Sequence, residues 1–113
     1  MTQSGSDRET GGRSFSNSIE ALASHRRRRV LYYLLDTDDG LVPTDDLVDH
    51  VLEHDPKADD RDEITLSLHH VHLPKLSDAG LIEYDTQGGT VRYRESTMVE
   101  GLLDALRELE ANG

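Results

Sequence analysis

Apolar residues recur at helical spacing in five stretches of the chain and alternate with polar residues in three shorter ones. The helical pattern predicts helices over residues 17–24, from Ser24 to about Leu35, from Thr44 to about Leu52, over about 61–79 and over 97–111. The alternating pattern predicts a short strand at 41–43 and a hairpin of strands 81–85 and 90–94, closed by the turn at 86–89. The predicted fold is therefore mainly α with a small β-hairpin (α+β).

Polar residues at the starts of these stretches are the expected helix caps. The predicted caps are Asn17, Ser24, Thr44, Asp60 and Thr97, and Glu20, Glu63 and Glu100 stand where a capping box places its acid. The expected core residues of the first three helices are Ile19, Leu22, Ala23, Val30, Leu31, Leu34, Leu35, Leu47, Val48, Val51 and Leu52.

The stretch over about 61–79 has apolar residues on two sides of one helix. Leu68 and Val71 lie on one side, and Leu66, Leu73 and Leu76 lie on the other. One small core cannot cover both sides of a straight helix. Because Pro74 lacks an N–H and disrupts a helix interior, we expect a bend around His70 to Pro74 and an end near Gly80.

A helix followed by a hairpin with arginines on one face is the order of a recognition helix and a wing. We therefore interpret residues 17–95 as a winged helix-turn-helix domain with its recognition helix at about 61–79 and its wing at about 81–94. Residues 1–16 are polar and aperiodic, which predicts a disordered tail. Residues 96–113 are assigned as a C-terminal dimerisation helix.

Charge complicates a DNA-binding interpretation. The chain has 23 acidic and 12 basic residues, a net charge of −11, and ten of the twelve basic residues are Arg. Residues 36–63 alone hold twelve acids against Lys57 and Arg61. An acidic, lysine-poor composition is typical of proteins from salt-in halophiles, where molar salt shortens the Debye length to about 3 Å. The distribution of the cations is then more informative than their number.

Candidate DNA contacts come from three segments. Residues 64–77 contain no acid but hold several hydrogen-bond donors, and the hairpin places two arginines on one face. The candidate residues are Arg26, Arg27, Thr65, Ser67, His69, His70, Lys75, Arg92 and Arg94. Each group has an alternative: the arginine run pairs with acidic neighbours, the histidines pack at the bend, and the hairpin arginines pair with Glu83 and Asp85. These alternatives stay open at this stage.

Other classes of site have little support. The chain has no cysteine, so disulfides and thiolate metal sites are excluded. His50 and His54 are spaced to share a metal, but no third ligand is placed, and we expect exposed or helix-end histidines. No nucleophile–base or carboxylate pair indicates an enzyme. No metal, other cofactor or membrane is expected to bind, and the chain lacks a signal peptide, which predicts a cytoplasmic protein.

The last predicted helix carries a repeating apolar seam. The candidate dimer-interface residues are Val99, Leu102, Leu103, Leu106 and Leu109. A seam on a terminal helix favours pairing with a second copy, although the helix could instead fold back onto the core. The protein itself is therefore an expected partner.

The segment His69 to Asp85 (HHVHLPKLSDAGLIEYD), with SHRRRRVLYYLL upstream, resembles a haloarchaeal winged-helix domain family of uncharacterised function. More remotely, His72-Leu73…Leu76…Ala79-Gly80-Leu81 is similar to the H-L-x-x-L-x-x-A-G-L signature of ArsR-type regulators. The resemblance covers about residues 17–95 and implies a winged helix and a dimeric transcription regulator. Metal sensing is not implied because the cysteines are missing, and Pro74 departs from ArsR recognition helices.

Two functions follow. The favoured expectation is a homodimeric, sequence-specific regulator that binds double-stranded DNA. The alternative is a winged-helix protein–protein interaction module that does not bind DNA. DNA binding would require a continuous basic strip joining Arg26–Arg29, Lys75, Arg92 and Arg94, so the surface charge separates the two hypotheses.

Overall fold

The computed structural model describes residues 16–112. A helix over residues 16–21 comes first. The remaining elements are α2 (His25–Asp36), β1 (Leu41–Pro43), α3 (Thr44–His54), α4 (Arg61–Ser67), the π-helix η1 (Leu68–His72), α5 (Leu73–Asp78), β2 (Ile82–Asp85), β3 (Thr90–Tyr93) and α6 (Thr97–Asn112). The fold is mainly helical with a small antiparallel sheet, an α+β arrangement compatible with a winged helix. The predicted tail falls outside the described residues except for Ser16, which is helical.

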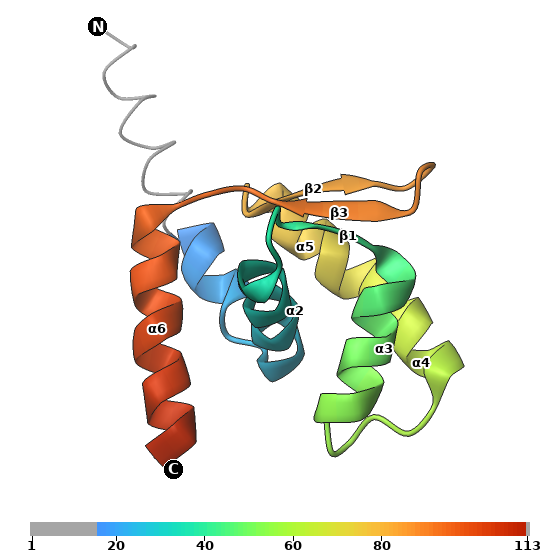
Figure 1. The fold of residues 1–113 in the computed structure, drawn as a ribbon, viewed down its shortest axis with the longest axis horizontal. Helices are drawn as coiled ribbons and strands as arrows, with labels where there is room; N and C mark the ends of the chain where they lie inside the picture. Colours follow the sequence, from blue (N-terminus) through green and yellow to red (C-terminus); the bar gives the residue numbers. More distant parts are fainter. Residues whose placement is uncertain (1–15, 113) are drawn as a thin grey trace, which may run out of the picture.

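The sheet lies along one side of a group of helices (Figure 1). Its strand order is β1-β3-β2, so β3 is the central strand. Val91 of β3 lies opposite Val42 of β1 on one side and opposite Tyr84 of β2 on the other. The predicted pairing of strand 41–43 with the hairpin is therefore confirmed. Val42 and Val91 are buried, whereas Arg92 is exposed, as expected from alternation along β3.

One hydrophobic core joins these elements. It includes Leu22, Val30, Leu31, Leu34, Val42, Leu47, Val48, Val51, Ile64, Leu68, Leu73, Leu76, Ile82, Val91, Val99 and Leu103. Two predictions for the first helix were wrong: Ile19 is 44% exposed and Ala23 is exposed, while Ala21 is fully buried. The helix ends at residue 21, three residues earlier than expected, so Ala23 lies outside it. Leu35 and Leu52 are only partly buried.

Two of the predicted caps are confirmed. The side chain of Ser24 accepts a hydrogen bond from the Arg27 N–H, and that of Asp60 accepts one from the Asp62 N–H. Gly80, with a φ of +78°, follows the end of α5 as predicted.

The predicted caps of α3 and α6 were wrong by one residue. Thr44 already belongs to α3, and its hydroxyl donates to the carbonyl of Gly89 at 3.3 Å. Ser96, not Thr97, caps α6, because its Oγ accepts from the Val99 N–H at 3.2 Å. The tertiary contacts of Thr44 with the hairpin explain the first error, which local sequence signals could not show.

The predicted break in the 61–78 segment takes the form of a π-turn. The N–H of Leu73 donates to the carbonyl of Leu68, five residues back. This extra residue in the turn brings Ile64, Leu68, Leu73 and Leu76 to the buried side together. The expected grouping of Leu68 with Val71 and of Leu66 with Leu73 was wrong, because both Leu66 and Val71 lie outside the core.

Candidate docking face and the fate of the predicted DNA contacts

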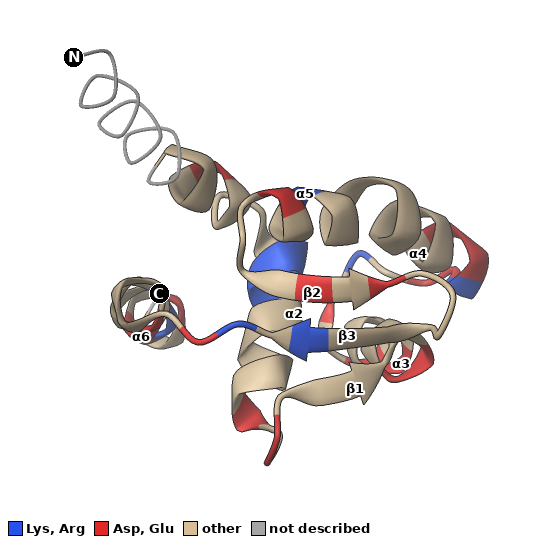
Figure 2. Cartoon of the chain, turned by 90° about the horizontal axis from the view of Figure 1, so that it is seen from above, with Lys and Arg blue, Asp and Glu red and all other residues tan. Residues whose placement is uncertain are grey.

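The arginine run of α2 is occupied by contacts within the chain. Arg26 pairs through Nε with Asp55 at 3.2 Å and through Nη1 with Glu63 at 3.3 Å, and it also donates to Ser67. Arg28 pairs with Glu110 at 3.0 Å. The alternative in which the arginines pair with acidic neighbours therefore describes these two residues. Figure 2 shows the blue segment of α2 between α6 on one side and α3 and α4 on the other.

Arg27 is buried and makes its contacts within the chain. It is 8% exposed, and its guanidinium donates to the carbonyls of Ala21 at 2.7 Å and Glu20 at 3.2 Å. Its Nη1 also lies 3.1 Å from Nδ1 of His72. The guanidinium thus ties the first helix to the 61–78 segment, and a DNA contact by Arg27 stays a prediction.

His72 is held in its neutral form. Burial, and next the positive charges of Arg27 and Arg26, lower the pKa of His72 to about 4. Its Nδ1 can then accept from the Arg27 guanidinium, which is consistent with the short distance between them. Among the clustered histidines, His72 is thus the one packed at the bend.

The remaining predicted contacts of the 61–78 segment are divided between packed and exposed positions. Thr65 donates to the carbonyl of Arg61, Ser67 accepts from Arg26, and His69 is hydrogen-bonded to the Tyr84 hydroxyl. His70 is exposed. Lys75 pairs with Glu20 of the first helix at 3.4 Å. Of the predicted polar contacts on this segment, His70 keeps the most solvent access.

On the hairpin, Arg92 and Arg94 are both exposed. Arg92 stands opposite Glu83 in the sheet, with Nε 3.9 Å from the carboxylate. No ion pair joins Arg94 to another residue of the described chain. The continuous basic strip expected of a DNA-binding surface does not form, because Arg26, Arg27 and Lys75 are all engaged within the chain.

Acidic residues lie at the edges where a winged helix would meet a phosphate backbone. Asp45 and Asp46 occupy the first turn of α3, and Asp62 and Glu63 that of α4. Asp85 ends β2. Figure 2 shows red on α3, on α4 and on β2, next to the one blue band of β3.

The outer side of the 61–78 segment is apolar. Leu66 is 59% exposed and Val71 is 53% exposed, and both point away from the buried side of the helix. His70 and the partly exposed Pro74 line one groove together with Val71, and Leu66 is exposed one turn before His70. We call Leu66, His70, Val71 and Pro74 the docking face. A sequence pattern with apolar residues on two sides of one helix was the signal for this face.

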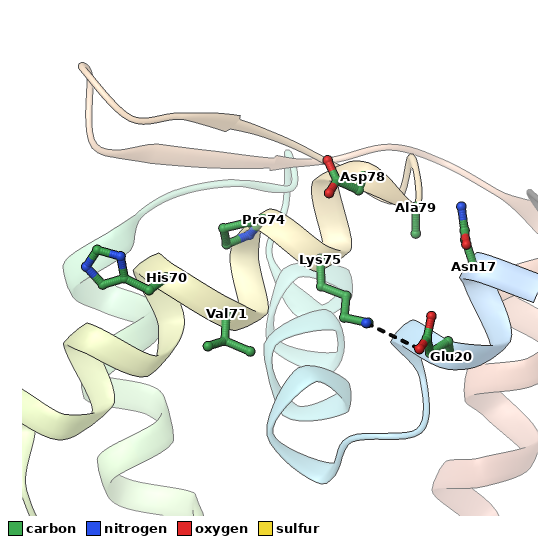
Figure 3. A pocket seen from close by; sticks show the side chains of 8 residues that line it. All are labelled: Asn17, Glu20, His70, Val71, Pro74, Lys75, Asp78 and Ala79. Atoms are coloured by element: carbon green, nitrogen blue, oxygen red, sulfur yellow. Dashed lines mark ion pairs between the residues drawn. The ribbon is translucent and has the colours of Figure 1, made fainter.

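A groove of about 450 Å³ adjoins the docking face. Its lining residues are Asn17, Glu20, His70, Val71, Pro74, Lys75, Asp78 and Ala79. In Figure 3, His70, Val71, Pro74 and Lys75 follow one another along the helix, and Asn17 and Glu20 face them from the first helix, with the Lys75–Glu20 ion pair spanning the gap. The docking face thus continues into a groove that combines apolar walls with Glu20 and Asp78.

Comparison with protein-family models matches residues 19–92 to the Domain of unknown function (DUF7344). The chain belongs to the DUF7344 family. The match begins within the first helix, covers the docking face and nearly all of the hairpin, and ends before α6. No curated protein and no solved structure matches this DUF7344 chain.

The DUF7344 chain shows two further negative features. Across residues 16–112, no helix is both long and apolar enough to cross a membrane. Within the same residues, no group of three or more His, Asp or Glu side chains is placed to hold a metal ion.

His50 and His54 stack with ring centroids 4.1 Å apart, and burial followed by the charge of His54 lowers the pKa of His50.

Proposed function

We propose that this chain is a winged-helix-like interaction domain that binds a protein segment carrying apolar and basic side chains. The observation that carries the proposal is the docking face: Leu66 and Val71 are more than half exposed on a helix whose neighbouring cations are already paired within the chain. Exposed apolar residues grouped on one surface are typical of protein interfaces.

Charge selects the class of partner. The docking face is bordered by Asp62 at one end and by Asp78 at the groove, whereas the neighbouring Glu63 and Glu20 are paired with Arg26 and Lys75. The whole chain carries a net charge of −11. A cationic segment would be attracted to this surface, whereas a nucleic acid would be repelled by the same acids. An amphipathic helix with apolar residues on one side and Lys or Arg beside them has the matching chemistry.

A matched pair of peptides tests the proposal. A 16-residue Leu/Lys amphipathic helix and the same helix with Glu in place of Lys are titrated against the full chain by fluorescence anisotropy. We expect the Lys peptide to bind and the Glu peptide not to bind. Replacing both Leu66 and Val71 by Ser should weaken binding at least 10-fold, because about 1.4 kcal/mol corresponds to tenfold and each side chain contributes more than that when fully buried.

The control variant carries Arg92→Ala and Arg94→Ala, which leave the docking face intact. Peptide binding should stay within twofold of the unaltered chain. Equal binding of both peptides, or no effect of the serine substitutions, would contradict the proposal. Circular dichroism checks that each variant is folded.

Homodimeric DNA binding is the second candidate, favoured by the two exposed arginines of the hairpin and by the winged-helix-like element order. The likeness to ArsR-type regulators and the haloarchaeal origin inferred from the sequence support it and stay predictions. If duplex DNA is the partner, Arg92→Ala with Arg94→Ala should weaken binding to all duplexes alike and flatten its salt dependence. The Leu66 and Val71 substitutions should then have the smaller effect.

A further inference from the structure

The C-terminal helix α6 attaches to the rest of the chain through one side only. Val99 and Leu103 are each 1% exposed and belong to the core. Glu110 accepts from the Tyr32 hydroxyl at 2.9 Å and pairs with Arg28, and Arg107 pairs with Asp36 at 3.0 Å. The predicted dimer seam is therefore divided, because Val99 and Leu103 already pack inside their own chain.

The other side of α6 is apolar and free of charge. Met98 is 46% exposed, Leu109 is 67% exposed, and Ala105 is exposed between them. Leu102 lies at the border of this side, because it is half-buried and packs partly against the core. Their spacing of four, three and four residues is the heptad spacing of paired helices. We call Met98, Leu102, Ala105 and Leu109 the second stripe. Figure 2 shows α6 end-on at one edge of the molecule.

Gly101 borders this stripe and has no explanation within the chain. It lies inside a helix, where glycine is destabilising relative to alanine. A Cβ added there would meet no described atom within 4 Å, so the chain's own packing does not require its small size. Close approach of a second helix would require it.

We infer that two copies of this chain pair through the second stripes of α6 in antiparallel orientation. A twofold axis midway between residues 103 and 104 sets Met98 opposite Leu109 of the other copy and Leu102 opposite Ala105. Each large side chain thus meets a small or flexible one, so the stripe is complementary to its own reversed copy. This inference is independent of the docking face.

Orientation also follows from the size and charge pattern. A parallel pair would place Ala105 opposite Ala105 and leave a gap in the stripe. It would also set Asp104 and Glu108 level with the same residues of the other copy, which is unfavourable for like charges. The antiparallel pair keeps the two Asp104 residues near the axis but moves the two Glu108 carboxylates toward opposite ends of the interface.

Length limits the affinity. From Met98 to Leu109 the stripe spans roughly 17 Å at about 1.5 Å per residue. Such a helix pair buries less than the roughly 1,200 Å² of a standard interface, so we expect a weak dimer. Salt should strengthen the dimer, because it screens repulsion between two chains of net charge −11. A cationic partner on the stripe would show the opposite salt response.

Sedimentation of the full chain at 0.1 M and at 1 M NaCl tests the inference. The Debye length is about 10 Å at the lower and about 3 Å at the higher salt concentration. We expect a monomer–dimer equilibrium that shifts toward dimer at 1 M. Leu109→Glu should raise the dissociation constant at least tenfold. Ala111→Glu adds the same charge away from the stripe and should change it by less than twofold. A chain that remains monomeric at 0.5 mM in both salts would overturn the inference.

Cross-linking tests the orientation. Because the chain has no native cysteine, Met98→Cys and Leu109→Cys can be made separately, oxidised alone and oxidised as a mixture. The antiparallel pair predicts a disulfide dimer only in the mixture, where the thiol introduced at position 98 of one copy can meet the thiol introduced at position 109 of the other. Dimers from each variant alone, with none enriched in the mixture, would overturn the antiparallel assignment.

Discussion

The 61–78 segment and α6 both carry more apolar surface than the core covers, but they expose it in different patterns. The segment 61–78 turns four apolar residues inward through its π-turn and leaves Leu66 and Val71 outside, between acidic residues. Helix α6 instead leaves a heptad-spaced, uncharged stripe that ends at Leu109. The comparison shows that spacing and flanking charge, rather than exposed apolar area alone, separate a surface suited to a cationic partner from one suited to a second copy.

The largest expected effect is the difference in stability between substitutions on the inner and on the outer side of the 61–78 segment. Leu73 is fully buried, so Leu73→Ala should lower the free energy of unfolding by about 3 kcal/mol through lost burial and a cavity. Val71→Ala on the outer side should change it by less than about 0.5 kcal/mol. Urea unfolding measures both. Similar losses for the two variants would mean that the π-turn does not sort the residues as described.

A smaller effect is the pH dependence that His72, in the 61–78 segment, gives to the free energy of unfolding. The folded pKa of His72 is lowered to about 4, below its ordinary value of 6.5, so the unfolded chain binds more protons between these values. The stability contributed by neutral, buried His72 should therefore be fully present above pH 6.5 and should be lost as the pH falls toward 4. After allowance for partial exposure, the loss is on the order of 2 kcal/mol.

His72→Gln is the control for the pH effect. Glutamine can still accept a hydrogen bond from Arg27 but does not titrate. The variant should lose most of the stability change between pH 6.5 and 4, as measured by urea unfolding at a series of pH values. An unchanged profile would assign the effect to other groups.

The smallest expected effect is the loss of stability when a contact that attaches α6 to the rest of the chain is removed. Hydrogen bonds from Tyr32 and Arg28 lower the pKa of the Glu110 carboxyl despite the opposing effect of burial. Glu110→Gln removes the charge that pairs with Arg28 and should cost about 1 kcal/mol, because this ion pair is partly exposed. Glu108→Gln, on an exposed position of the same helix, should cost less. Faster amide exchange along α6 in the first variant alone would support the difference.

The contribution of Glu110 to the free energy of unfolding should also change with pH in a defined direction. Because the pKa of Glu110 is lowered in the folded chain, its contribution is present above its ordinary value of 4.5 and is lost as the pH falls through the folded value. This window lies at and below the lower end of the His72 window. Acidification should therefore weaken the 61–78 segment before it loosens α6.

Local signals in the sequence predicted much of the fold. The order of the helical segments, the pairing of strand 41–43 with the hairpin, the caps Ser24 and Asp60 and the stop at Gly80 are confirmed. These features depend on residues within a few positions of one another, on side-chain alternation, or on the backbone freedom of glycine. The apolar second sides of 61–78 and of the last helix were also visible as patterns.

Contacts between distant residues decided the surface on which function depends. Arg26 meets Asp55 and Glu63, which are 29 and 37 positions away, and Arg27 meets His72 across 45. No local rule distinguishes such an engaged arginine from one free to bind phosphate, because the difference lies in which acids the fold brings near it. Likewise, only packing against the core shows that Val99 and Leu103 are buried while Leu109 stays exposed, since all three share the same apolar character in the sequence.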